Sequence, residues 1–213
     1  LNADGETPSV LTAVTDPVEA GLVESLDAPG GSMTGSTDAT DVEGQIDMLL
    51  KVVPSAKTVG IFYNSSEVNS EVQADQAKQA LEAKGVKVEV ATVTSTNDVQ
   101  QTMTSLAAKV DAIYLPTDNT VASTASTIGE ILQEAKVPAM GSDAAVIDAT
   151  LFTYGVDYHA IGVQAGELAV KILKGEKPAD LPVQKPNTAA VTVNEEMATA
   201  LGFDAETIKA LEK

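Results

Sequence analysis

The stretch TVGIFYNSSEVNSEVQADQAKQALEAKGVKVEVATV, residues 58–93, decides the fold class of this chain. It begins with an apolar run typical of a buried strand (58–64) and continues with helical spacing (70–85). Gly85 is expected to end the helix, and alternating apolar residues (86–93) predict a second strand. A strand, a helix and another strand in this order indicate two parallel strands joined by a helix.

The same alternation continues beyond this stretch, as far as Asp157. Parallel sheets covered by helices on both faces are built from such repeats. The sequence therefore predicts a complete doubly wound α/β domain of about five strands. Its further strands are expected at 111–116, 137–142 and 151–157, and its further helices at 97–109, 119–136 and 144–150.

The two ends of the chain have fewer strands than this central part. One strand is expected at 9–15 and one at 189–194, with a glycine-rich loop at 29–37. Helices are expected to start near Pro17 and to cover 41–53, 158–175 and 195–202. Two strands make too thin a sheet to stand alone. The ends therefore either pack together as a second lobe that lacks strands or decorate the central domain.

Composition excludes several classes of function. The 213 residues contain 13 Lys and Arg against 31 Asp and Glu, so a formal charge of −18 makes a nucleic-acid partner unfavourable. The chain has no cysteine, which excludes disulfides and thiolate metal sites. It contains no apolar run of about 18 residues and shows no signal peptide. Since it also lacks an initiator Met, we expect a mature or truncated chain.

Catalytic motifs are absent from the sequence. The only histidine is His159, which we interpret as a helix-start residue. There is no GxSxG elbow and no GxxxxGK[ST] phosphate loop. We therefore expect no enzyme, no cofactor and no metal site.

Polar residues follow every predicted strand, where parallel sheets bind ligands. Ser, Thr, Asp and Asn also cap helices, so one such residue alone does not indicate a site. The run Thr117-Asp118-Asn119-Thr120 exceeds what one cap needs. We expect Asn119 or Thr120 to cap the following helix, which would leave Asp118 facing a ligand.

Four segments resemble one known family: LTAVTDPVEAGLVESLDAPGGSMTG (11–35), VGIFYNSSEVNSEVQADQAKQA (59–80), VDAIYLPTDNTVAS (110–123) and TYGVDYHAIGVQAGELAVKILKGEKPADLPV (153–183). This is the family of ABC-transporter substrate-binding proteins whose known ligands include tryptophan, phenylalanine and tyrosine. The resemblance runs through nearly the whole chain in the expected order.

The resemblance implies a type I periplasmic-binding-protein fold. Two doubly wound α/β lobes with parallel sheets are joined by a three-stranded hinge and close over an amino acid-like ligand. By this alignment residues 55–155 form the complete second lobe. Residues 1–54 and 156–213 form the remainder of the first lobe with the hinge and C-terminal elements. The resemblance also implies export, usually with a lipid anchor, and a membrane permease as partner.

Members of this family carry about three further strand–helix units before LTAVTDP. We therefore expect the first lobe of this chain to be truncated. An open edge on strand 9–15 would favour dimerisation or strand exchange.

The family site, carried over residue by residue, implies a ligand-binding set. The resemblance assigns Ser66, Asn69 and Ser70 to a ligand carboxylate and Asp118, then Asp143, to a ligand ammonium. The full expected set is Thr15, Asp16, Ser66, Asn69, Ser70, Thr117, Asp118, Asn119, Asp143 and Asp157. Tyr63 and Tyr154 are the nearby residues able to stack on an aromatic ligand.

Two other classes of function are alternatives to transport. The same fold serves as the effector domain of transcriptional regulators or sensors, which the acidic charge disfavours. An enzyme on a doubly wound fold is disfavoured by the absent nucleotide loop and the single histidine.

Overall fold

A computed structural model describes residues 6–186 and 189–212 of the chain. The chain divides into two compact units. Unit 1 comprises residues 1–40 and 156–189, and unit 2 comprises residues 41–155 and 190–213. The chain passes between them after Thr40, Gly155 and Ala189.

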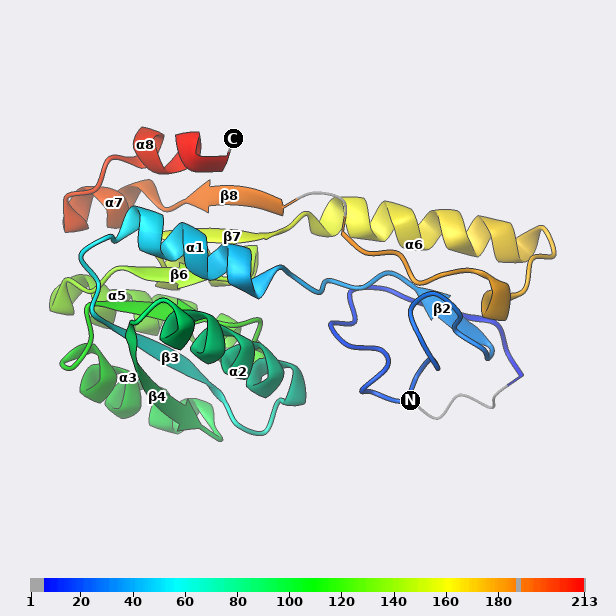
Figure 1. Cartoon of the computed structure of the whole chain (residues 1–213), viewed down its shortest axis with the longest axis horizontal. Coiled ribbons are helices and arrows are strands. Elements are labelled where there is room, and N and C mark those ends of the chain that lie inside the picture. The colour runs from blue at the N-terminus through cyan, green and yellow to red at the C-terminus, as the bar shows by residue number, and fades with distance from the viewer. Residues whose placement is uncertain (1–5, 187–188, 213) are drawn as a thin grey trace. The chain divides into compact units, whose positions relative to one another are not determined.

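Unit 2 is built on a six-stranded sheet with the order β4-β3-β5-β6-β7-β8 (Figure 1). The four pairs from β4 to β7 are all parallel. This confirms the predicted α/β fold with a mostly parallel sheet. The strands are β3 (Thr58–Asn64), β4 (Lys87–Val93), β5 (Ala112–Leu115), β6 (Ala139–Gly141), β7 (Phe152–Val156) and β8 (Ala189–Val193).

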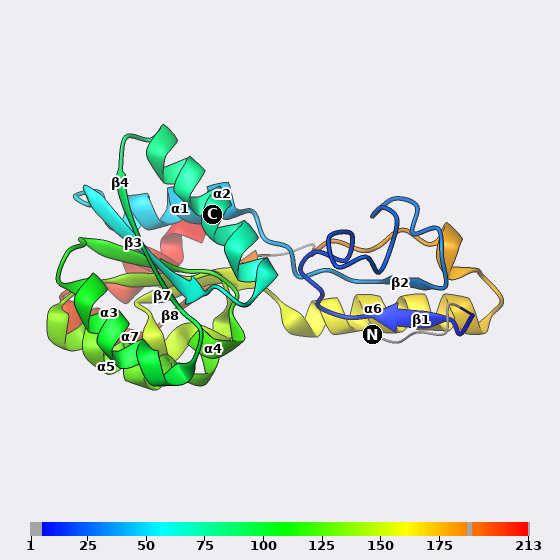
Figure 2. The same ribbon diagram turned by 90° about the horizontal axis from the view of Figure 1, so that it is seen from below.

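Helices cover both faces of this sheet, because β3, β5 and β7 are apolar on both sides (Figure 2). The helices α1 (Val42–Val52) and α2 (Val68–Ala83) bury Ile46, Leu49 and Leu81 in one core. The helices α3 (Val99–Ala107), α4 (Asn119–Ser123) and α5 (Ala125–Ala135) line a second core on the opposite face. Together these cores fix the sheet whose carboxyl edge carries the candidate site.

A buried tyrosine links three elements beneath that edge. The Tyr114 side chain is fully buried, and its hydroxyl donates to Oε1 of Gln45 at 2.8 Å. Nε2 of Gln45 donates in turn to the Tyr154 carbonyl oxygen at 2.7 Å. Helix α1 is therefore tied by hydrogen bonds to both β5 and β7.

Unit 1 contains the parallel pair β1 (Ser9–Leu11) and β2 (Met33–Gly35) and the long helix α6 (Tyr158–Leu173). Its small core contains Leu11, Val23 and Val183. The Ser36 hydroxyl donates to the Ile161 carbonyl oxygen at 3.1 Å and ties β2 to α6. Within the described ranges β1 pairs with β2 alone, and dimerisation through its other edge stays a prediction.

The division between units differs from the expected one at two places. Residues 41–54 and 190–213 belong to unit 2, whereas we expected them with residues 1–40. Helix α1 packs its apolar stripe on the core of unit 2, and β8 extends the unit 2 sheet. Long-range packing therefore determines to which unit both segments belong. Their local sequence pattern contains no signal of that packing.

Four local expectations differ from the structure. Residues after Pro17 form turns instead of a helix, and the glycine-rich loop 29–37 contains strand β2. The expected helix 119–136 is broken at Thr124, whose φ of −117° and ψ of 13° end α4 and precede α5. The expected helix 144–150 is the 3₁₀ segment η2 (Ala144–Ala149).

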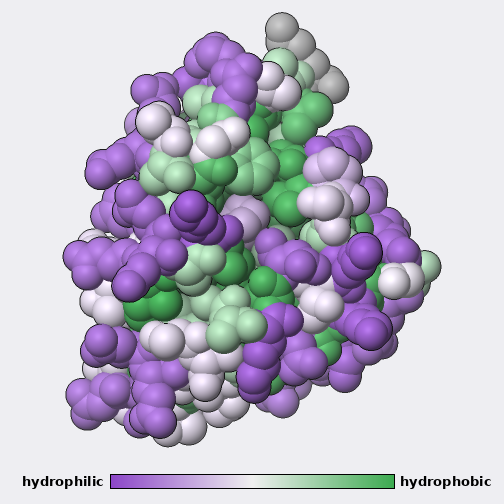
Figure 3. All heavy atoms as spheres, turned by 90° about the vertical axis from the view of Figure 1, so that its left-hand side faces the viewer, coloured by the Kyte–Doolittle hydropathy of each residue, from purple (hydrophilic) through white to green (hydrophobic). Residues whose placement is uncertain are grey.

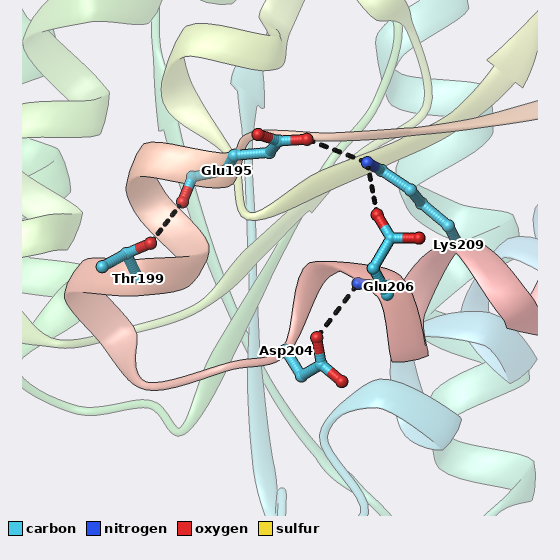
Figure 4. A network of polar contacts seen from close by, with 5 residues as sticks. All are labelled: Glu195, Thr199, Asp204, Glu206 and Lys209. Atoms are coloured by element: carbon cyan, nitrogen blue, oxygen red, sulfur yellow. Dashed lines mark hydrogen bonds and ion pairs between the residues drawn. The ribbon is translucent and has the colours of Figure 1, made fainter.

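The C-terminal helices α7 (Glu195–Leu201) and α8 (Ala205–Lys209) form a small polar network (Figure 4). Nζ of Lys209 lies 2.9 Å from Oε1 of both Glu195 and Glu206, and these bonds raise the Lys209 pKa. The groups are exposed, so water screens the attraction. Ile208 anchors α8 instead, because its side chain is buried in the core of unit 2.

The surface of unit 2 is mostly hydrophilic on the face that Figure 3 shows, with hydrophobic residues visible between the polar ones. This agrees with the strongly acidic composition. No helix within residues 6–186 and 189–212 combines the length and hydropathy that crossing a membrane requires.

Candidate functional site

The candidate site lies where β3, β5 and β6 end, at the carboxyl edge of the unit 2 sheet. Asn64 ends β3, Thr117 and Asp118 follow β5, and Ser142 follows β6. Because these strands are parallel neighbours, their ends meet at one edge. The start of α2 reaches the same edge, where Ser70 donates a hydrogen bond to the Thr117 carbonyl oxygen.

Asp118 is the buried carboxylate of this edge, with 3% of its surface exposed. Its Oδ2 accepts the Asn64 backbone N–H at 2.7 Å, and its Oδ1 accepts the Val121 N–H at 2.9 Å. Asp118 is therefore itself the N-cap of α4. The expectation that Asn119 or Thr120 would cap this helix was wrong, because the Asp118 carboxylate reaches the free N–H of the first turn.

Burial raises the pKa of Asp118 above its ordinary value. The N–H groups of Asn64 and Val121 and the Ser70 hydroxyl oppose this rise, and the charge of Glu67 adds to it. None of the described groups that shift this pKa is a cation. The carboxylate is thus held by dipoles without a counter-ion, which is costly for a buried charge.

This raised pKa predicts a specific pH dependence. The folded state binds the Asp118 proton more tightly than the unfolded chain does. Protonation therefore adds stability below the unfolded-state pKa, and this gain is lost as pH rises through the folded-state pKa. We expect a carboxyl ¹³C titration to place the Asp118 midpoint above that of an aspartate in an unfolded chain. A midpoint at or below that reference would contradict this account.

Three side chains of α2 hold the backbone of Thr117, and Ser142 contacts its hydroxyl. Nδ2 of Asn69 and Oγ of Ser70 donate to its carbonyl oxygen at 2.8 and 3.0 Å. Oε1 of Gln73 accepts its backbone N–H at 2.8 Å. Its hydroxyl lies 3.0 Å from the Ser142 hydroxyl. Asn69 and Ser70 thus position the β5–α4 turn in this structure.

Glu67 contributes a second carboxylate, which sequence reasoning did not select. Its Oε2 accepts the backbone N–H and the side-chain Nδ2 of Asn119, at 3.1 and 2.9 Å. Its Oε1 lies 3.3 Å from the N and Oγ1 of Thr120. This carboxylate joins the start of α2 to the start of α4 and engages Asn119.

The remaining predicted site residues are divided between the two units. In unit 2, Ser66 is exposed and its N–H donates to Oδ1 of Asn64, while Asp143 is buried and caps η2 through the Ala145 N–H. The structure therefore brings Ser66, Asn69, Ser70, Thr117, Asp118, Asn119 and Asp143 into unit 2, at the ends of its strands β3, β5 and β6.

Three predicted residues, Thr15, Asp16 and Asp157, belong to unit 1. Asp16 accepts the N–H groups of Val18 and Glu19, and Thr15 accepts the Thr37 hydroxyl on its carbonyl oxygen. Asp157 caps α6, because its Oδ1 accepts the His159 and Ala160 N–H groups at 2.8 and 3.2 Å. Their assignment to a ligand stays a prediction.

Gln73 and Ser142 belong to the edge although the sequence analysis did not select them. Gln73 lies on the stripe of α2 that also buries Ser70, Ala77 and Leu81. A polar residue within an apolar helical stripe is the signal that would have identified it. Over the described residues, no group of three or more His, Cys, Asp or Glu side chains is arranged to hold a metal ion.

Comparisons with known proteins identify the family of this chain. A tyrosine-binding protein of Clostridioides difficile is 36% identical over 201 residues, which cover 94% of this chain and 58% of that protein. The chain therefore spans little more than half the length of this relative. The crystal structure of an ABC domain in complex with L-Trp from Streptococcus pneumoniae has a TM-score of 0.88 and 37% identity, covering 98% of this chain and 73% of that one.

A second solved structure is the ligand-free, open form of a substrate-binding protein with adhesive properties from Clostridium difficile. It has a TM-score of 0.79 and 40% identity, over 95% of this chain and 69% of that one. The family model described as ABC transporter substrate binding protein matches residues 2–208. This chain belongs to the family of ABC transporter substrate-binding proteins.

Proposed function

We propose that this protein is the extracytoplasmic solute-binding component of an ABC importer and that its ligand is an aromatic amino acid. The similar proteins support the ligand class, since one is named for tyrosine binding and another is described in complex with L-Trp. The proposed role is binding without catalysis, with a membrane permease as partner and a lipid anchor at the cell surface. Family membership supports the transport role.

The observation that carries the proposal is the buried, cation-free carboxylate of Asp118 at the carboxyl edge of the sheet. The carboxylate accepts the backbone N–H groups of Asn64 and Val121 and also interacts with the Ser70 hydroxyl, and its two oxygens together have about four lone-pair sites, so it can accept a further hydrogen bond. An ammonium group placed there would supply the missing counter-ion and lower the Asp118 pKa. We propose Asp118 as the first partner of the ligand ammonium and the buried Asp143 as the second.

A ligand titration tests this function. We expect L-tyrosine, L-tryptophan or L-phenylalanine to bind saturably and to raise the thermal unfolding midpoint. At a ligand concentration of about 100 times Kd the folded state gains about 2.7 kcal/mol. The matched control is 3-(4-hydroxyphenyl)propionate, which is tyrosine without its ammonium group and should bind much more weakly. Stabilisation by sugars, with no response to any amino acid, would overturn the proposal.

A further inference from the structure

Gln73 carries a buried hydrogen-bond donor that the chain leaves unsatisfied. Its side chain is 3% exposed, and its Nε2 has no hydrogen-bond partner among the described residues. Its Oε1 accepts the Thr117 backbone N–H at 2.8 Å, and only an oxygen can accept there. This bond fixes the orientation of the carboxamide, so that the unsatisfied atom is a donor.

The carboxamide lies inside the polar cluster of the sheet edge. The Ser142 hydroxyl is 3.5 Å from its Oε1, and the hydroxyls of Ser142 and Thr117 are 3.0 Å apart. Asn69 and Ser70, in the first turn of α2, bond to the carbonyl oxygen of the same Thr117. Gln73 is therefore held against the turn that also carries Asp118.

The dipole of helix α2 favours an anionic acceptor for this donor, and it acts against the nearby negative charges of Glu67 and Asp118. Helix α2 has 16 residues, and no side chain caps its N-terminus, so the positive end of its dipole faces this edge. A buried donor without a partner costs the full desolvation free energy of that group. An acceptor on a bound molecule would remove this cost and gain from the dipole.

We propose that Gln73 is a ligand-binding residue, whose Nε2 N–H donates to a carboxylate oxygen of the bound amino acid. The inference rests on the proposed function, because it assumes an amino-acid ligand. The edge then offers a donor for the carboxylate and, at Asp118, an acceptor for the ammonium. When the bound molecule has no free carboxylate, the Gln73 amide stays unpaired. The site therefore favours ligands that carry this group.

The test is Gln73→Glu, which keeps an oxygen to accept the Thr117 N–H and replaces the donor by a carboxylate. The control is Gln76→Glu, the same change at an exposed position of α2. At pH 8 we expect Gln73→Glu to bind L-tyrosine or L-tryptophan about 10- to 100-fold more weakly than wild type. The affinity should partly recover toward pH 5, where the introduced carboxyl gains a proton to donate. Gln76→Glu should bind as wild type does.

A second measurement uses the unmodified protein. In ¹⁵N spectra the Gln73 side-chain amide should shift on addition of L-tyrosine and respond far less to tyramine, which lacks the carboxylate. Wild-type affinity for Gln73→Glu at pH 8, or an equal amide response to both molecules, overturns the assignment and leaves the amino-acid function standing. Failure of the wild-type protein to bind any amino acid overturns the proposed function and the assignment with it.

Discussion

Gly129→Ala is expected to destabilise unit 2 by about 3 kcal/mol. Gly129 is buried in α5, where a Cβ would lie 2.1 Å from the Asp148 carbonyl oxygen and 3.4 Å from the Ala149 Cα. These are backbone atoms of η2, and the neighbouring Val146 and Ala149 are themselves buried in the core. The segment therefore cannot move away without opening the packing between α5 and the sheet.

Gly166→Ala is the matched control, since Gly166 also lies within a helix. No atom lies within 4 Å of its added Cβ, and the residue is exposed on α6. Alanine should stabilise this helix by about 0.5–1 kcal/mol, because it loses less backbone entropy on folding. Urea unfolding followed by circular dichroism measures both variants against wild type. Equal stability of Gly129→Ala and wild type would show that the contact with η2 is not tight.

Asp118→Ala is expected to lower the free energy of unfolding by about 2–4 kcal/mol. The change removes the acceptor of two backbone N–H groups, those of Asn64 and Val121. Both bonds are buried, so water cannot replace the lost oxygens. The expected cost exceeds that of an ordinary cap because the same carboxylate also joins β3 to the β5–α4 turn.

Asp41→Ala provides the comparison within the same unit. Asp41 is exposed and caps α1 by accepting the Gly44 N–H at 3.0 Å. Its removal should cost about 1 kcal/mol, the usual cost of losing a helix cap. Chemical denaturation of both variants gives the two values. If Asp118→Ala cost no more than Asp41→Ala, the Asp118 carboxylate would not be a structural link, and its burial would need another explanation.

Much of unit 2 was predictable from local sequence patterns. The strands of residues 58–64 and 111–116 were each found within one residue of their predicted ends, because a period of two or a continuous apolar run is a property of neighbouring residues. The break at Thr124 was missed, since the stretch 119–136 has helical spacing throughout. The extent of the sheet was also underestimated, because β8 joins it from far along the chain.

The candidate site was also predictable only in part, because some of its contacts join segments that are far apart in the sequence. The sequence marked Thr117 and Asp118 as an unusually polar turn after a strand, and they lie at the carboxyl edge of the sheet. It assigned the helix cap to the wrong residue, because Asp118 and Asn119 are equally suitable by type. The side chain that accepts the Thr117 N–H belongs to Gln73, 44 residues earlier, in the middle of a helix.

The sequence by itself determined the alternation of strands and helices, the acidic surface, the family and the turn that carries Asp118. Only the tertiary structure decided which polar atoms form hydrogen bonds within the protein and which are left to bind a ligand. Ser70 and Asn69 bond to the Thr117 carbonyl oxygen, whereas Nε2 of Gln73 has no partner among the described residues. The physical reason is that periodicity arises from neighbouring residues, while burial and hydrogen-bond pairing depend on segments that meet only after the sheet has formed.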